Sequence, residues 1–297
     1  MAVVVFGVVT LVFVLLRVAA GDPARLMNAP GQQEEIVQIT RERLGTDRPL
    51  VEQYIDYLVN VAQGDLGVSF HGGQSVLAEV LSALPNTIAL AFVTIVVSST
   101  IALILGIGAA LRPNSLLDRS VLVYVSLGLA IPSFWLAIVL VLIFSVRLGW
   151  LPAIDMDGPQ SFILPVVTLA VALTPVLIRT IRQSFLETLS EDHVRAARAR
   201  GIPERRVILV HTLKVAALPL ITLIGLQTGL ILAGSYVVES IFNWPGIGKL
   251  TLDAVAGRNF PMIQGAVLVA ALVFVVVNFV VDMAYGVLDP RIRLGYK

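Results

Sequence analysis

The sequence has no cysteine, only three histidines and few charges, since 14% of its 297 residues are Asp, Glu, Lys or Arg. A chain without cysteine forms no disulfide framework, zinc ribbon or thiol nucleophile. The histidines (His71, His193 and His211) do not pair with carboxylates at metal-ligand spacing, and no Ser/His or paired-Asp constellation lies within an apolar run. These absences argue against a metal centre and against an intramembrane protease.

Apolar residues are abundant instead: 57% of the chain is hydrophobic and the mean hydropathy is +0.89. A soluble domain of this length cannot bury that much apolar surface. A bilayer core of about 30 Å needs roughly 20 apolar residues per helix. We therefore predict an all-α polytopic membrane protein with six transmembrane helices. The predicted spans are residues 1–20, 86–111, 121–148, 163–181, 218–238 and 262–288.

The first span could be mistaken for a secretory signal peptide, because Val18-Ala19-Ala20 resembles a cleavage site. It lacks a basic leader, however, and its apolar run is longer than the roughly 7–15 residues of a signal-peptide core. We expect this segment to stay in the membrane. The run opens at Met1, which favours a few additional residues ahead of it.

The distribution of basic residues predicts the orientation of the spans. Thirteen Lys and Arg residues fall on one set of loops, eight of them between residues 179 and 214, whereas seven fall on the other set. Short loops rich in Lys and Arg stay in the cytoplasm. Both termini, with the tail 289–297, are therefore predicted to be cytoplasmic. The segments predicted outside are 21–85, 149–162 and 239–261.

The long external segment, 21–85, has the pattern of soluble structure. Residues 34–44 and 50–61 are predicted to form short amphipathic helices, and Gly45-Thr46-Asp47-Arg48-Pro49 between them is typical of a turn.

The cytoplasmic loop 183–217 carries the most information. Ser190 is predicted to be the N-cap of a helix with Glu191 and Asp192 in its first turn, where the helix dipole favours anions. Gly201 is suited to the left-handed position that ends a helix, and Pro203 to the start of a second one. The loop is either a basic connector or a helix–turn–helix whose small alanines let another protein approach.

A family resemblance favours the second interpretation. Ala196-Ala197-x-x-x-Gly201, followed by Leu218-Pro219, resembles the "EAA" loop of type I ABC importer permeases. In that family the loop is a coupling helix that docks in a groove of a cytoplasmic ATPase. Arg195 stands where Glu is usual, and the spacing to Leu218-Pro219 is long. Both departures match the dipeptide/oligopeptide/nickel branch, which typically reads EDYVRTARAKG where residues 191–201 here read EDHVRAARARG.

The resemblance to that branch extends over nearly the whole chain, with a permease domain at 76–288, and is greatest to the B-type subunit. It rests on six further motifs in the expected order. These are Ala20-Gly21-Asp22-Pro23, Gly64-Asp65-Leu66-Gly67, Leu84-Pro85-Asn86-Thr87, Pro132-Ser133-Phe134-Trp135-Leu136, the run 238–248 and Leu288-Asp289-Pro290-Arg291-Ile292-Arg293.

The resemblance implies a permease subunit of an ABC importer for short peptides in a bacterial inner membrane. Its partners would be a homologous second permease, two ATPase subunits or one fused pair, and an extracytoplasmic substrate-binding lipoprotein, with no nucleic acid. Members of the branch also carry nickel, haem or glutathione. The implied ATPase-coupling residues are Glu191, Asp192, Arg195, Ala196, Ala197, Gly201, Glu204, Arg205 and Arg206.

Catalytic, cofactor and metal residues are not expected on this chain, so ATP and Mg²⁺ would bind the partner subunits. Gly246-x-Gly248-Lys249 is not a phosphate loop, because Asn243 and Leu250 replace its required Gly and Ser/Thr. An ion-gradient-driven transporter is the main alternative. It would show internal repeats and more ionisable residues within the spans.

Candidate pathway or gate residues lie in or beside the last two spans. They are Gln227, Gly229, Phe242, Trp244, Pro245, Asn278 and Asp282. We expect Gln227 to line the pore and Asp282 to form a salt bridge with a loop arginine. Trp244 is either an aromatic anchor at the membrane interface or part of an external gate.

Two features of the spans concern their packing. Gly225-x-x-x-Gly229 predicts close contact between helices in lipid. Pro132 and Pro175 are predicted to interrupt spans three and four, each as a static kink or a hinge.

Overall fold

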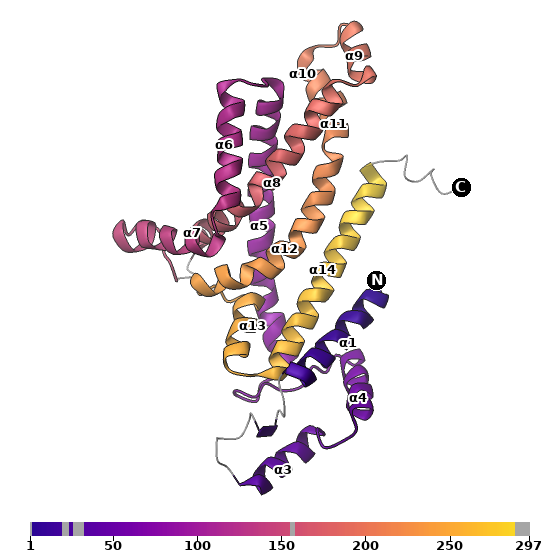
Figure 1. The fold of residues 1–297 in the computed structure, drawn as a ribbon, viewed down its shortest axis with the longest axis vertical. Helices are drawn as coiled ribbons and strands as arrows, with labels where there is room; N and C mark the ends of the chain where they lie inside the picture. Colours follow the sequence, from indigo (N-terminus) through magenta and orange to yellow (C-terminus); the bar gives the residue numbers. More distant parts are fainter. Residues whose placement is uncertain (1, 20–23, 26–32, 155–157, 289–297) are drawn as a thin grey trace, which may run out of the picture. The chain divides into compact units, whose positions relative to one another are not determined.

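The computed structural model describes residues 2–19, 24–25, 33–154 and 158–288 (Figure 1). Almost all of this part of the chain is helical, and it holds a single isolated bridge, between Val68 and Ser75, in place of a sheet. The helices form two compact units. The first unit contains residues 1–87 and 245–275, and the second contains 88–244 and 276–297. The predicted tail 289–297 lies outside the described residues.

Among the described residues, the first unit is built from four short helices and the first parts of two long ones. They are α1 (Ala2–Ala19), α3 (Glu34–Leu44), α4 (Leu50–Ala62), the first part of α5 (Val76–Leu111), α13 (Ile247–Ala256) and the first part of α14 (Phe260–Leu288). The predicted helices at 34–44 and 50–61 are confirmed. Gly45 ends α3 with a φ of 61°, which explains the glycine in the predicted turn. Buried apolar residues of α5, α13 and α14, among them Val76, Ile247 and Met262, form the core.

Helix α13 was not predicted, because its sequence was taken as part of an external loop. The backbone N–H of Ile247, at its first turn, donates to Thr87 Oγ1 at 2.8 Å. The Asn86 amide donates to the carbonyl of Pro245 at 2.9 Å. Two motifs that are distant in sequence, 84–87 and 238–248, thus meet through helix-capping contacts.

The second unit is organised around α8 (Ile163–Leu189), which packs against α6, α7 and α12. About two thirds of the most apolar stretch of α8 is buried inside the protein, whereas the corresponding share is 28% for α5 and for α14, so α8 is the central helix. The other elements are α6 (Leu116–Ala130), α7 (Ser133–Leu140), the π-helix η1 (Val141–Arg147), the 3₁₀ turn η2 (Pro159–Phe162), α9 (Asp192–Ala199), α10 (Glu204–Arg206), the π-helix η3 (Val207–Thr212), α11 (Leu213–Ala216) and α12 (Leu218–Ile241).

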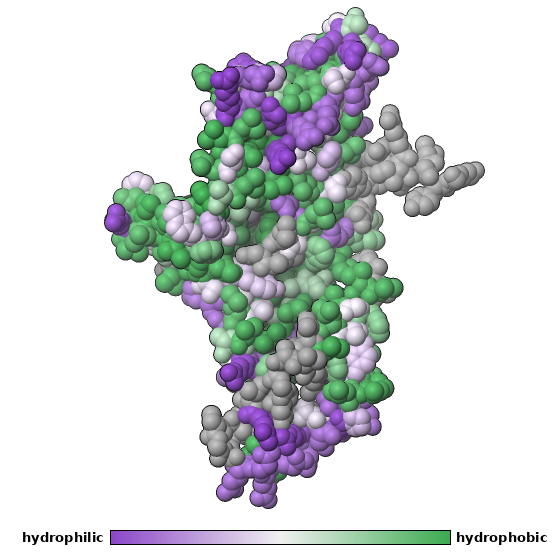
Figure 2. All heavy atoms as spheres, viewed as in Figure 1, coloured by the Kyte–Doolittle hydropathy of each residue, from purple (hydrophilic) through white to green (hydrophobic). Residues whose placement is uncertain are grey.

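Three helices among the described residues are long and apolar enough to cross a membrane, or up to five if each bent pair counts as one span. Figure 2 shows hydrophobic side chains along α6 and α7 and hydrophilic ones around α9 and α10. Apolar side chains left on a protein surface in such numbers fit contact with lipid. The fold is therefore that of an all-α, multi-pass membrane protein.

The segment predicted as one span at 121–148 is not a straight helix. Its two halves, 116–130 and 133–147, meet at 98°. Ile131 precedes a proline and adopts an extended backbone, with ψ 119°, because the proline ring excludes the helical conformation there. Pro132 then caps α7. The proline breaks the helix outright rather than kinking it.

Pro175 differs from Pro132 in that it does not end its helix. Helix α8 continues through this residue, which is buried. Its ring fills the space beside Gly128 of α6, where a Cβ would come within 2.6 Å of Pro175 Cγ. Pro175 therefore serves as a close-packing surface between α6 and α8, and a kink or hinge at this residue stays a prediction.

Candidate coupling site

The candidate site is the elbow, residues 190–206, between the end of α8 and the start of η3 (Figure 1). The predicted N-cap role of Ser190 is wrong. Its backbone is still helical, with φ −87° and ψ −9°, and its hydroxyl donates back to the Glu187 carbonyl at 2.7 Å, which closes α8. Glu191 is the first residue with an extended backbone, so it is the N-cap of α9, although its side chain makes no capping hydrogen bond.

The end of α9 follows the prediction. Gly201 has a φ of 71°, and its N–H donates to the Arg198 carbonyl at 2.9 Å. A side chain would strain this left-handed conformation, which explains the glycine. Pro203 then caps α10 in an extended conformation. A short turn between Gly201 and Pro203 thus reverses the chain.

The elbow has a small hydrophobic core of its own. Val194, Ala197 and Val207 are buried together, and Leu189 and Ile202 pack against them. Ala197 therefore faces inward, so the expectation that both alanines form the approach surface is wrong for this residue. Ala196 and its neighbour Ala199 are exposed. The helical repeat separates these roles, since adjacent residues on a helix point about 100° apart.

A bidentate ion pair joins the two short helices. Arg198 Nη2 donates to Glu204 Oε1 at 2.6 Å, and Arg198 Nε donates to Oε2 at 3.2 Å. These hydrogen bonds hold the pKa of the Glu204 carboxyl below its usual value and raise the pKa of the Arg198 guanidinium. A fork-to-carboxylate contact fixes orientation as well as distance. It clamps α9 to α10 across the turn.

Further polar contacts fix the start of α9. Arg195 donates to the Ser190 carbonyl through Nη2 at 2.8 Å and lies 3.6 Å from Asp192 Oδ1. His193 Nδ1 lies 3.0 Å from Glu191 Oε2. Arg205 and Arg206 are exposed, so their guanidinium groups extend from the surface of the elbow. The outer surface of the elbow is consequently rich in charge of both signs.

A buried ion pair close to the elbow was missed by the sequence analysis. Arg182 of α8 donates through Nε and Nη2 to the two carboxylate oxygens of Asp118 at 2.7 and 2.8 Å. Asp118 also accepts from the Asn114 N–H, and its own N–H donates to Ser115 Oγ. Ser115 is the N-cap of α6, and Ser115-x-x-Asp118 is a local signal for that cap but not for the contact with Arg182. The pair joins the start of α6 to the last two turns of α8.

Comparison with known proteins places this chain in a family. The sequence profile described as "Binding-protein-dependent transport system inner membrane component" matches residues 102–294. The profile described as "Binding-prot-dependent transport system membrane comp, N-term" matches residues 1–91. The chain belongs to this family. The resemblance to dipeptide/oligopeptide-type ABC importer permeases is thereby confirmed.

Relatives of this permease cover almost its full length. The "Glutathione transport system permease protein GsiC" of Escherichia coli O6:H1 is 41% identical over 97% of this chain and 94% of its own. The protein of the same name from Salmonella choleraesuis is also 41% identical, over 96% and 94%. A solved chain from inward-facing crystals of the MetNI methionine ABC transporter is similar in fold, with a TM-score of 0.60, 18% identity, and coverage of 71% of this chain and 96% of that one.

Membership makes this chain the membrane subunit of an ABC importer in the inner membrane. Such a permease works with separate ATPase subunits, where ATP is hydrolysed, and with a substrate-binding protein and a second permease. An ion-gradient-driven transporter is therefore the wrong class.

Four candidate pathway residues of the permease, Gln227, Gly229, Asn278 and Asp282, lie on α12 and α14. Gln227 on α12 is buried, and Gly229 and Asn278 are half-buried. Gly225 meets α14 closely, because a Cβ there would lie 2.8 Å from Val281 Cγ1, so the glycine spacing does mark a helix contact. The side chain of Asp282 lies outside the described residues, so its predicted salt bridge with a loop arginine stays a prediction.

The aromatic motif after α12 is buried. Trp244 is 2% exposed, and its ring meets that of Phe162 edge to face at 4.6 Å. Phe242 is also buried, whereas Pro245 is exposed. A ring enclosed by protein does not reach the membrane interface, so the anchor interpretation of Trp244 is wrong. Within the described part of the chain no cluster of three metal-ligating side chains occurs.

Proposed function

We propose that the elbow docks on a separate ATPase subunit and passes its ATP-driven movement into the helices of this permease. One observation carries the proposal. The elbow has its own buried core and its own ion pair, Arg198–Glu204, yet it presents Ala196, Arg205 and Arg206 to the outside. Such a part can be pushed or pulled without unfolding, because its shape does not depend on the partner.

Two connections would carry the displacement onward. Val207 of η3 belongs to the elbow core, and Leu189 contributes to both that core and the main core of the second unit. Arg182 ties the adjacent turn of α8 to α6. In our proposal the elbows of this chain and of a second, homologous permease move together when the ATPases close on ATP and Mg²⁺. Their movement exchanges inward-open and outward-open arrangements of packed helices.

The orientation belongs to the same proposal. The elbow, both termini and the loop with Arg112 and Arg119 lie in the cytoplasm, and the segment between α1 and α5 lies outside. The excess of Lys and Arg on the elbow side supports this. The segment between α1 and α5 and the loop after α12 would form the surface on which a substrate-binding lipoprotein docks.

We propose short peptides as the cargo, with glutathione, a tripeptide, as the first to test. The relatives' printed function supports this choice over nickel or haem. Uptake of labelled glutathione by cells with the whole importer should be blocked by vanadate and reduced by competing di- and tripeptides. Uptake that ignores excess peptide but falls with Ni²⁺ or haem would show a different cargo.

The chain's lack of cysteine allows a direct test of docking. In the assembled importer, an Ala196→Cys variant should crosslink to an ATPase subunit, since this position is exposed on α9. Glu52→Cys, exposed on α4, is the matched control and should not crosslink. If the thiol of the Ala196→Cys variant reacts with a soluble maleimide as fast as the thiol of the Glu52→Cys variant, both in the assembled importer, the elbow is not a docking site.

A further inference from the structure

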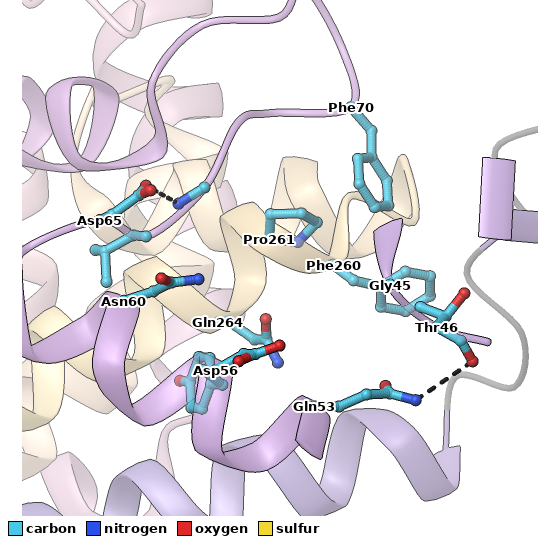
Figure 3. Close-up of a pocket in the computed structure, with 13 residues that line it drawn as sticks. Gly45, Thr46, Gln53, Asp56, Asn60, Asp65, Phe70, Phe260, Pro261 and Gln264 are labelled. Atoms are coloured by element: carbon cyan, nitrogen blue, oxygen red, sulfur yellow. Dashed lines mark hydrogen bonds between the residues drawn. The ribbon is translucent and has the colours of Figure 1, made fainter. Parts of the chain in front are cut away.

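A cavity of about 260 Å³ lies in the first unit (Figure 3). Four segments enclose it: the α3–α4 turn, one face of α4, the loop that leads to α5, and the start of α14. Its lining includes Gln53, Asp56, Tyr57, Asp65, Phe70 and Phe260. A hydrogen bond from Asn259 Nδ2 to Ser69 Oγ at 2.7 Å fastens the loop beside the start of α14, so the two walls are held together.

Two polar atoms among the lining residues are buried and without a hydrogen-bond partner. Gln53 is 8% exposed, and its Nε2 donates to the carbonyls of Arg48 and Thr46 at 2.7 and 3.3 Å, yet its Oε1 has no partner. The Tyr57 hydroxyl is also buried and unpartnered, and burial raises its pKa to about 12. Buried polar groups without partners are uncommon and costly. Both atoms can accept a hydrogen bond, so they call for a donor.

The charge of the lining points to the kind of donor. It contains the carboxylates of Asp56 and Asp65 but no Lys, Arg or His. Asp56 contacts Arg48 at 3.2 Å from outside the lining, and both side chains are more than half exposed. Asp65 uses Oδ1 to accept from the Gly67 N–H at 2.8 Å, and its only described side-chain contact is made by this oxygen. Arg48 thus pairs with Asp56, whereas the exposed carboxylate of Asp65 has no cationic partner among the described contacts.

Aromatic rings complete the lining. Phe70 and Phe260 meet at 6.5 Å between centroids with their planes near perpendicular, so one ring presents its edge to the other. Ring faces attract ammonium and guanidinium groups through the negative face of the π-system. Acidic, acceptor-rich and aromatic surroundings together are suited to a cation that donates several hydrogen bonds.

We propose that this cavity receives an arginine or lysine side chain of the substrate-binding protein when that protein docks on the permease. The inference rests on the proposed function, which puts the segment between α1 and α5 outside the cell. The size of the cavity favours a side chain over a whole solute, since pockets for small-molecule ligands are usually about 300–1,000 Å³. Charge complementarity at such a contact would set which binding protein is accepted.

The test measures docking of the binding protein on the complete importer in lipid nanodiscs. Asp65→Asn keeps an oxygen for the Gly67 N–H but removes the charge, and Tyr57→Phe removes only an unpartnered hydroxyl. We expect each variant to raise the Kd of docking about tenfold, because hydrogen bonds to charged groups contribute roughly that factor. Glu187→Gln, an exposed acid on α8 outside the docking segment, is the control and should leave Kd unchanged.

A second arm identifies the partner side chain. Alanine replacement of each surface Arg and Lys of the binding protein should reveal one whose loss is not additive with Asp65→Asn. If Asp65→Asn does not assemble, Tyr57→Phe decides the question. Wild-type Kd in the pocket variants overturns the inference. So does tight binding of free arginine amide that does not compete with docking, which would make the cavity a solute site. If the binding protein does not dock on the wild-type importer at all, the proposed function itself fails.

Discussion

The Asp118–Arg182 pair offers a quantitative prediction about how α6 and α8 are joined. We consider Asp118→Asn, which keeps the size of the side chain and an acceptor for the Asn114 N–H but removes the charge that faces Arg182. The Asp118 side chain is 3% exposed and that of Arg182 is 22% exposed. Removal of one partner of a fully buried pair costs about 3–5 kcal/mol. Since water reaches part of Arg182, we expect about 2–3 kcal/mol here.

The assay is thermal unfolding of the importer in nanodiscs, together with uptake per ATP hydrolysed. For a chain of this length, 2–3 kcal/mol corresponds to a fall in Tm of about 3–5 °C. Uptake per ATP should also fall, because the elbow would then move α8 without α6. Arg182→Gln should behave like Asp118→Asn. Arg179→Gln, an exposed arginine one turn earlier on α8, is the control and should match the wild type.

The double variant Asp118→Asn/Arg182→Gln separates the pair from its parts. Once neither side chain carries a charge, the buried charge that makes each single variant costly is gone. The double variant should therefore lose less stability than the two single variants added together. Losses of stability that add up in the double variant would refute the claim that this contact joins the two helices. So would single variants with the same Tm as the Arg179→Gln control.

Two more predictions concern other contacts. A Cβ on Gly106 would lie 2.0 Å from Ile181 Cγ2. Gly106→Ala should thus destabilise the second unit by about 1–3 kcal/mol. The control Gly108→Ala should cost less, because its Cβ would meet only the end of the Leu117 side chain, at 3.3 Å. Equal Tm values for the two variants would contradict this packing. Because Arg198 holds the pKa of Glu204 below its usual 4.5, the contribution of their ion pair is present above pH 4.5 and is lost as pH falls through the lowered pKa. The rate of amide hydrogen exchange in α9, corrected for the intrinsic rate at each pH, should stay constant from about pH 7 to 5. Glu204→Gln should raise this corrected rate at every pH in the range. A corrected rate that increases in the wild type as the pH falls from about 7 to 5 would count against the clamp.

Local signals in the sequence predicted the elbow well. Gly201 tolerates the left-handed backbone that other residues rarely adopt, and Pro203 fixes its own φ, so the position of the turn follows from the two residues themselves. The inward position of Ala197 could not be read in the same way, because alanine is small enough for either face. It is decided by Val207, a residue of a later element.

Long-range contacts account for what the sequence analysis missed. Arg182 and Asp118 are 64 residues apart, and the basic surroundings of Arg182 suggested only a cytoplasmic loop. Helix α13 depends on a cap from Thr87, which belongs to α5, so its own sequence gave no start signal. The break at Ile131–Pro132 was recognised as a proline effect, but its 98° angle depends on the packing of α7 against α8 and α12.

The unbroken course of α8 has a mechanical consequence. At 1.5 Å per residue, its 27 residues form a rod about 40 Å long. A tilt of about 10° around the middle of such a rod displaces each end by roughly 3.5 Å in opposite directions. If α8 tilts as one body, a small swing at Leu189 is reversed in direction at Ile163, at the other end of the helix.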